Sequence, residues 1–263
     1  MTDHATEGLL QIRSITGTAL LVDFAIGHGV SLESALRHTG IRERMLMSPD
    51  GYVTQDQEIA VMRNIVRHVG DEPGLGLLAG VMCQPPLLGA LACAVMSQST
   101  VRRALEVGLR YADLSCSFAR YSVERHDDEI WLVRDDSTVP EDLRRFSVEH
   151  DLGALACLQR EMLPSRWRTK RVEVTVAAHP VYDGFAMVLG VPELVCDAPR
   201  TLIVFGAELL NLPMPQASPI TARRYESQCA AMLQRRLDQS SVSGQARGPV
   251  IRGARRLALV TEG

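Results

Sequence analysis

The hydrophobic period of this chain changes near residue 117, and this change constrains its fold more than any other feature. From residue 15 to 112, apolar residues recur at the spacing of α-helices, with glycines where the stripes end. In the runs 117–124 and 130–133 they follow the pattern of short β-strands separated by a polar turn. The chain is therefore expected to have an α/β (α+β) fold, in which a helical N-terminal part, a β-hairpin and further short strands pack with helices in one domain.

Local signals set the expected boundaries of these elements. The clearest is Thr54-Gln-Asp-Gln57, a capping box in which two side chains satisfy N–H groups at the start of a helix. The patterns predict a helix that ends at Gly27, helices over 31–38, 54–70 and 99–112, the hairpin 117–133, a helix over 140–162, a strand over 171–176, a helix over 181–189, a strand over 201–205, an extended proline-rich connection over 211–219 and a last helix over 220–237. Residues 1–237 are therefore expected to form the folded domain.

Charge is distributed unevenly along the chain. Of its 28 basic and 31 acidic residues, 8 basic and 3 acidic ones lie in residues 223–263, which leaves 20 and 28 in the rest. The net charge of -3 excludes a uniformly basic nucleic-acid binder, whereas the arginine-rich end can attract polyanions without reading a sequence. Residues 240–249 also have the Ser/Gly composition of a linker, so residues 238–263 are expected to form a flexible basic segment.

The cysteines and the apolar stretches exclude several classes of protein. The six cysteines are at least ten residues apart and form no CxxC pair, which argues against a structural zinc site. The longest apolar stretch, 85–96, is interrupted by a glycine and is shorter than the roughly 20 residues that a membrane span needs. Because the N-terminus also lacks the pattern of a signal peptide, the chain is expected to be cytoplasmic, with free thiols, no membrane contact, no metal and no cofactor.

Two patterns that suggest phosphate binding or catalysis have a simpler explanation. Residues 74–80 read GLGLLAG, but this spacing follows a helix rather than a strand, so it indicates a helix that packs closely through its glycines. His150 and Cys157 are seven residues apart, about 10 Å along one helix, which is too far for a nucleophile and its base. The sequence also contains no GxSxG motif. The chain is therefore not expected to be an enzyme.

A few polar or polarisable residues in apolar surroundings are candidates for a small-molecule site. His150 lies on the apolar face of its predicted helix, Met82 and Gln84 lead into an apolar stretch, and Trp131 stands in the middle of a predicted strand. Small-molecule pockets are mainly apolar with a few polar groups. We therefore predict ligand contacts through Met82, Gln84, Trp131 and His150, with Trp131 close enough to report occupancy by fluorescence. The alternative for His150 is a hydrogen-bonded position in the core.

Residues 18–46 imitate a helix-turn-helix, with two short helices joined by a glycine turn. A recognition helix must offer cations to phosphates and hydrogen-bond donors to base edges. Between residues 18 and 40 the one formal cation is Arg37, which Asp23 and Glu33 oppose. This segment is therefore not expected to read DNA.

Short motifs occur along the chain in a characteristic order. They are His28-Gly-Val-Ser-Leu-Glu33, Thr39-Gly-Ile41, Gly70-Asp-Glu-Pro-Gly-Leu-Gly-Leu77, Leu88-Gly-Ala-Leu91, Ser99-Thr-Val-Arg-Arg-Ala-Leu105 and Phe205-Gly-Ala-Glu-Leu-Leu-Asn-Leu-Pro-Met-Pro215. In this order, over about residues 15–237, the chain resembles the N-terminal effector-binding domain of AraC/XylS-type transcriptional regulators, in the subgroup named arabinose-binding.

The resemblance implies a bacterial sensor that binds a small-molecule effector, forms a homodimer and controls promoter DNA through a C-terminal pair of helix-turn-helix motifs. Only six residues follow Leu257, so that DNA-binding part is expected to be missing, as in an expressed fragment or a truncated product. The family's dimerisation predicts a contact through the last helix, whose apolar stripe of Tyr225, Cys229, Met232 and Leu233 is expected to be exposed. Two alternatives stay open: a small-molecule enzyme of unidentified reaction, and a partner module that dimerises with an intact regulator.

Overall fold

The computed structural model describes residues 12–48, 50–162, 169–189 and 191–245. Its α-helices are α1 (Ile15–Gly27), α2 (Leu32–Leu36), α3 (Glu43–Leu46), α4 (Gln55–Val69), α5 (Leu75–Gly80), α6 (Pro85–Leu88), α7 (Ala90–Met96), α8 (Val101–Arg110), α9 (Arg144–Met162), α10 (Pro180–Leu189) and α11 (Pro219–Gln245). Its strands are β1 (Ile12–Ser14), β2 (Tyr52–Thr54), β3 (Arg120–His126), β4 (Glu129–Asp135), β5 (Thr169–Glu173), β6 (Leu194–Val195) and β7 (Thr201–Gly206). The expected α/β class is confirmed.

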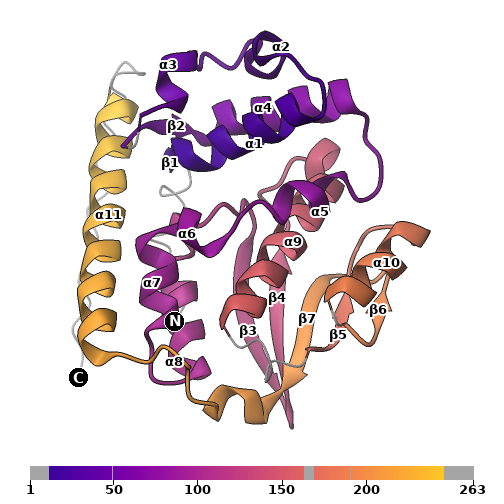
Figure 1. Cartoon of the computed structure of the whole chain (residues 1–263), viewed down its shortest axis with the longest axis vertical. Coiled ribbons are helices and arrows are strands. Elements are labelled where there is room, and N and C mark those ends of the chain that lie inside the picture. The colour runs from indigo at the N-terminus through magenta and orange to yellow at the C-terminus, as the bar shows by residue number, and fades with distance from the viewer. Residues whose placement is uncertain (1–11, 49, 163–168, 190, 246–263) are drawn as a thin grey trace, which may run out of the picture.

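Helices α1 to α4 form the N-terminal part of the fold, at the top of Figure 1. The capping box at the start of α4 is present: the Gln57 N–H donates to the Thr54 hydroxyl at 3.2 Å, and the Thr54 N–H donates to the Gln57 side chain at 2.9 Å. Phe24 of α1 and Ile65 of α4 are buried in a shared apolar core. The helical N-terminal part that the sequence predicts is therefore correct, although α2 and α3 are only five and four residues long.

The later strands form a five-stranded sheet in the order β3-β4-β7-β5-β6. Strands β3 and β4 are the predicted hairpin, with Val123 opposite Leu132. Side chains alternate along β4, so that Ile130 and Leu132 belong to one apolar cluster, whereas Trp131 and Val133 belong to another. We call the face that carries Ile130 and Leu132 the inner face, and Figure 1 shows α9 lying across the sheet.

Helices α5 and α9 pack backbone against backbone. A Cβ added to Gly76 would overlap the carbonyl of Phe146, and one added to Gly80 would overlap the carbonyl of His150. Only glycine allows two helices to approach so closely. The segment 74–80 is therefore the closely packed helix that its sequence indicates, and its glycines hold α9 in place.

The last helix, α11, runs beside α7 along the edge of the molecule (Figure 1). The stripe formed by Tyr225, Cys229, Met232 and Leu233 was expected to be exposed, but Cys229 is fully buried and the other three pack against the same apolar cluster. The expectation of an exposed stripe is wrong because α7 covers this face. It follows that the predicted dimer contact through these four residues has lost its structural basis.

The basic end of the chain is described only in part. Helix α11 continues past the expected boundary at residue 237 as far as Gln245, and residues 246–263 of the expected linker lie outside the described residues. Arg236 is buried and donates a hydrogen bond to the carbonyl of Asp113, so it is not available to a polyanion. Arg223, Arg224 and Arg235 are exposed.

Candidate functional site

A cavity of about 180 Å³ lies between helices α7, α8 and α9 and the inner face of the sheet. Leu132 of β4 and Phe205 of β7 contribute to its sheet side because they point to the same face of the sheet. The helical walls are almost entirely aliphatic and consist of Leu91, Ala92, Val95, Ala104, Leu105, Gly108, Leu109, Ala154, Leu155, Leu158 and Met162. The cavity is therefore mainly apolar, and it is somewhat larger than an apolar cavity of about 150 Å³ that holds benzene.

Asp151 of α9 is the centre of a polar cluster on one side of this cavity. Its Oδ2 atom accepts hydrogen bonds from the Ser117 hydroxyl at 2.6 Å, the Tyr121 hydroxyl at 2.9 Å and Nε of Arg134 at 2.9 Å. Burial raises the pKa of Asp151, but the charge of Arg134 and then His150 outweigh it, so this pKa lies well below its ordinary value. The carboxylate is thus charged and well satisfied within the protein.

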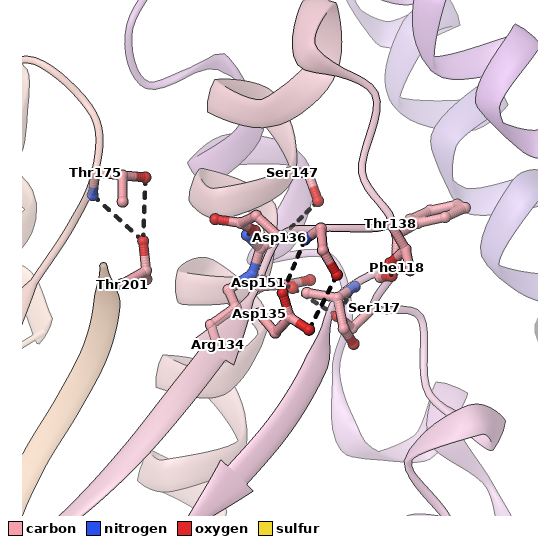
Figure 2. Close-up of polar contacts among 12 residues, drawn as sticks. Ser117, Phe118, Arg134, Asp135, Asp136, Thr138, Ser147, Asp151, Thr175 and Thr201 are labelled. Carbon is pink, nitrogen blue, oxygen red and sulfur yellow. Dashed lines mark hydrogen bonds and ion pairs between the residues drawn. The ribbon is translucent and has the colours of Figure 1, made fainter. Parts of the chain in front are cut away.

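Arg134 connects the sheet to α9. It lies near the end of β4 and points to the inner face, because it is two residues from Leu132. Figure 2 shows its guanidinium between Asp136 and Asp151, and it also donates to the Ser147 hydroxyl at 2.6 Å. Two carboxylates therefore surround this one buried cation.

His150 stands between Asp151 and Cys83. Its Nδ1 atom is 3.3 Å from Oδ1 of Asp151, and its Nε2 atom is 3.4 Å from Sγ of Cys83. Burial lowers the pKa of His150, but the hydrogen bond and the charge of Asp151 outweigh it, and the pKa is raised. Because a thiol is a weak hydrogen-bond partner, Nε2 is the atom of this cluster that gains most from a better one.

Cys83 and Cys116 line the same side of the cavity and hydrogen-bond to each other. This bond, together with burial, raises the pKa of the Cys83 thiol far above its ordinary value. The same bond lowers the pKa of Cys116, and the nearby His150 contributes. Of the two thiols, Cys83 is therefore the harder one to deprotonate.

The structure brings only one of the four predicted ligand contacts to this cavity, namely His150. Trp131 lies on the outer face of the sheet, with the guanidinium groups of Arg171 and Arg200 each 5.4 Å from its ring. Gln84 is exposed, and Met82 packs against the core of the N-terminal helices. Met82, Gln84 and Trp131 therefore do not line this cavity, and ligand contacts through them stay a prediction. The Trp131 indole, on the outer face of the sheet, is badly placed to report occupancy of this cavity.

The sequence does not single out Cys83, Cys116, Tyr121 or Asp151. One signal does exist for Asp151, because it follows His150 directly in the predicted helix, and a carboxylate that is buried there needs polar partners. The two cysteines come from segments far from α9 in sequence, and no spacing rule connects them with it. They become part of the site only through the tertiary fold.

Neither a metal cluster nor a membrane-spanning helix is found in the part of the chain that the structure describes. Within the described ranges, no group of three or more His, Cys, Asp or Glu side chains is arranged to hold a metal ion. In the same part of the chain, none of the helices is both long and apolar enough to span a bilayer. All six cysteines are free thiols.

Comparison with known proteins identifies the family. Residues 29–214 match the family described as the arabinose-binding domain of AraC transcription regulators, N-terminal. The chain belongs to this family. The resemblance that the order of motifs suggests is thereby confirmed.

Individual relatives of this AraC-type domain are themselves regulators. Uncharacterized HTH-type transcriptional regulators of Mycobacterium bovis and Mycobacterium tuberculosis are each 25% identical over 242 residues, which is 90% of this chain and 70% of theirs. The ornithine utilization regulator of Pseudomonas aeruginosa is 27% identical over 227 residues, which is 81% of this chain and 62% of its own length. The crystal structure of the transcriptional regulator CdpR from Pseudomonas aeruginosa has a similar fold, with a TM-score of 0.58, 16% identity, and coverage of 88% of this chain and 71% of that one.

Proposed function

We propose that this AraC-type domain senses a small-molecule effector in the cavity between α7, α8, α9 and the sheet, and that binding controls a transcriptional regulator. One observation carries the proposal: the cavity has aliphatic walls and a polar cluster on one side, which is the usual character of a small-molecule site. In this proposal the domain works in the cytoplasm without catalysis. DNA is contacted by helix-turn-helix motifs C-terminal to the described residues, as the name of the mycobacterial relatives suggests.

Helix α11 offers a route from the cavity toward the C-terminal end of the chain. It packs against α7, which forms one wall of the cavity, and buries Cys229 in the same apolar cluster. Glu226 accepts a hydrogen bond of 3.0 Å from Gln98, just after α7, and Arg236 donates to the carbonyl of Asp113, just after α8. A ligand that displaces α7 or α8 would therefore also displace α11.

The homodimer remains part of the proposal, with a different contact. Closed symmetric dimers are the commonest soluble oligomers. Because α7 covers the stripe that contains Cys229, the available surface of α11 is the opposite one, which includes Ile220, 76% exposed. The proposed dimer therefore uses that opposite face.

Native mass spectrometry of protein freshly purified from its host tests the proposed site. We expect a retained small molecule on the wild-type protein and none on Ala154→Phe, because residue 154 lines the cavity one helical turn from His150. Ala230→Phe, on the exposed side of α11, is the matched control and should keep the molecule. Retention of the same molecule by Ala154→Phe would place it elsewhere and contradict the proposal.

The arrangement of Cys83, His150 and Asp151 supports a second candidate function, thiol-dependent catalysis on a small molecule. A nucleophile, a base and a group that orients the base stand in the required order. The raised pKa of Cys83 opposes this, because the thiolate is the nucleophile. Rapid alkylation of Cys83 by iodoacetamide at neutral pH would favour the enzyme, whereas slow alkylation, which we expect, favours the sensor.

A further inference from the structure

We propose that the effector is a small, uncharged and mainly apolar molecule with one oxygen, a hydroxyl or a carbonyl, which binds His150 Nε2 in place of the Cys83 thiol. This inference rests on the proposed function and defines the class of molecule that the cavity accepts. Three properties of the cavity carry it: its size, its charge balance and its one poorly satisfied polar atom.

The size and walls of the cavity limit the ligand. A volume of about 180 Å³ corresponds to roughly seven to nine non-hydrogen atoms, since benzene occupies an apolar cavity of about 150 Å³. Side chains such as Leu91, Val95, Leu105 and Leu158 offer no hydrogen bonds to a ligand. A sugar would bury several hydroxyls against these walls without partners, and each would lose its hydrogen bonds with water. The family name therefore does not indicate the ligand of this chain.

The charges beside the cavity are already balanced. Arg134 lies between the carboxylates of Asp136 and Asp151, and His150 shares Asp151 from the other side. A ligand carboxylate would bring an additional negative charge next to Asp151, and a ligand ammonium would face the cationic side of Arg134 and His150. Burying either charge without a partner is unfavourable. A neutral ligand avoids both costs.

The hydroxyls of Ser117 and Tyr121 and the carboxylate of Asp151 have oxygen or nitrogen partners, whereas Nε2 of His150 faces a thiol. The hydroxyls of Ser117 and Tyr121 donate to Asp151, and the Gln159 side chain accepts from Thr169 at 3.3 Å. Gln159 also lies nine residues along α9 from His150, roughly 13 Å away along the axis, so a ligand of this size cannot reach both. Among the described residues, the hydrogen-bond partner of Nε2 is the Cys83 thiol at 3.4 Å. An oxygen is a stronger partner than sulfur, and a hydroxyl can either donate or accept there.

Titration calorimetry with benzyl alcohol, toluene and benzoate tests this inference. We expect benzyl alcohol and toluene to bind and benzoate to bind at least about tenfold more weakly than benzyl alcohol. In His150→Phe, the affinity for benzyl alcohol should fall by about tenfold relative to that for toluene, because the hydroxyl loses its partner. The exposed His68 of α4 provides the matched control, and His68→Phe should leave this ratio unchanged.

Cys83→Ala keeps the test decisive if His150→Phe fails to fold. Removing the thiol frees Nε2, so the affinity for benzyl alcohol should rise relative to that for toluene. A ratio that changes in neither variant, or benzoate that binds more tightly than benzyl alcohol, would overturn the inference. The proposed function would survive that result if Ala154→Phe abolishes binding. If neither toluene nor benzyl alcohol binds the wild-type protein, the inference is overturned, whereas the proposed function is decided separately by native mass spectrometry of the wild-type protein and Ala154→Phe.

Discussion

The two sides of helix α9 differ in how they are packed. On one side Gly153 meets α5, and a Cβ added there would lie only 2.6 Å from the carbonyl of Leu77. On the other side His150 and Ala154 line a cavity large enough for a small molecule. The side that packs on α5, which we call the closed side, fixes the position of the helix. The polar groups on the side that lines the cavity, which we call the open side, are held in place as a consequence.

Each side also holds one buried carboxyl group, and the two pKa values shift in opposite directions. Burial raises the pKa of Glu149, although its carboxylate accepts from the Tyr182 hydroxyl and from the N–H groups of Gly74 and Gly76. Burial acts on Asp151 as well, but the charge of Arg134 outweighs it. Three neutral donors and the smaller effect of the Arg145 charge therefore do not compensate for the burial of Glu149, whereas the buried ion pair with Arg134 does so for Asp151.

The largest effect is expected from Asp151→Asn on the open side. The substitution leaves Arg134 and His150 without their shared carboxylate, and breaking a buried ion pair costs about 3–5 kcal/mol of unfolding free energy. Urea unfolding measures this loss. Asp142→Asn is the control, because that ion pair with Arg63 is half exposed and contributes roughly 1 kcal/mol at most. Equal losses in the two variants would contradict the role assigned to Asp151.

Gly153→Ala tests the closed side directly. The added methyl group forces α5 and α9 apart, and overpacking of this kind costs about 1–3 kcal/mol. Ala154→Leu, at the neighbouring position, adds more volume but extends into the cavity, so its stability should change little or rise by about 0.5–2 kcal/mol. Gly153→Ala should therefore lower the thermal unfolding midpoint, and Ala154→Leu should leave it unchanged or raise it. A lowered midpoint in both variants would show that the cavity beside residue 154 does not accept the larger side chain.

Helix α11 extends the comparison to the outer wall of the cavity. Met232→Glu places a charge in the half-buried contact with α7 and should lower the free energy of unfolding by about 1–2 kcal/mol. Ala231→Glu, on the exposed side of the same turn, should change it by less than about 0.5 kcal/mol. Sedimentation should show an intact dimer for Met232→Glu and a weakened one for Ala231→Glu, because residue 231 lies about three helical turns from Ile220 and therefore on the face that the proposed dimer uses. If Met232→Glu alone dissociates the dimer, the stripe that contains Met232 is the dimer contact after all, as the sequence predicts.

The sequence predicts the elements of this fold far better than its site. The capping box at Thr54, the hairpin and the close-packed glycines 74–80 each depend on neighbouring residues, and local chemistry decides them. Local chemistry does not decide which face of the sheet carries Trp131. The alternation of side chains along a strand is compatible with either face until the helices cover one of them. An apolar stripe such as that around Cys229 likewise shows that a face is covered, without showing by what. The cavity could not be predicted because its walls depend on both: which strand residues face the helices, and which helix covers which apolar stripe.

The smallest expected effect is the pH dependence that separates the two carboxyl groups of α9. The raised pKa of Glu149 means that its stabilisation is present below the unfolded value of about 4.3 and is lost as the pH rises through its folded value. Asp151 behaves in the opposite way, since its lowered pKa provides stability above about 3.9 that is lost as the pH falls. Glu149→Gln should therefore become more stable relative to the wild-type protein as the pH is raised from 4 to 8. The measurement is urea unfolding of both proteins across this range, and His150 contributes equally to both and cancels in the difference. A difference that is constant with pH would mean that the donors around Glu149 compensate for its burial, and the contrast between the two sides of α9 would then be one of packing alone.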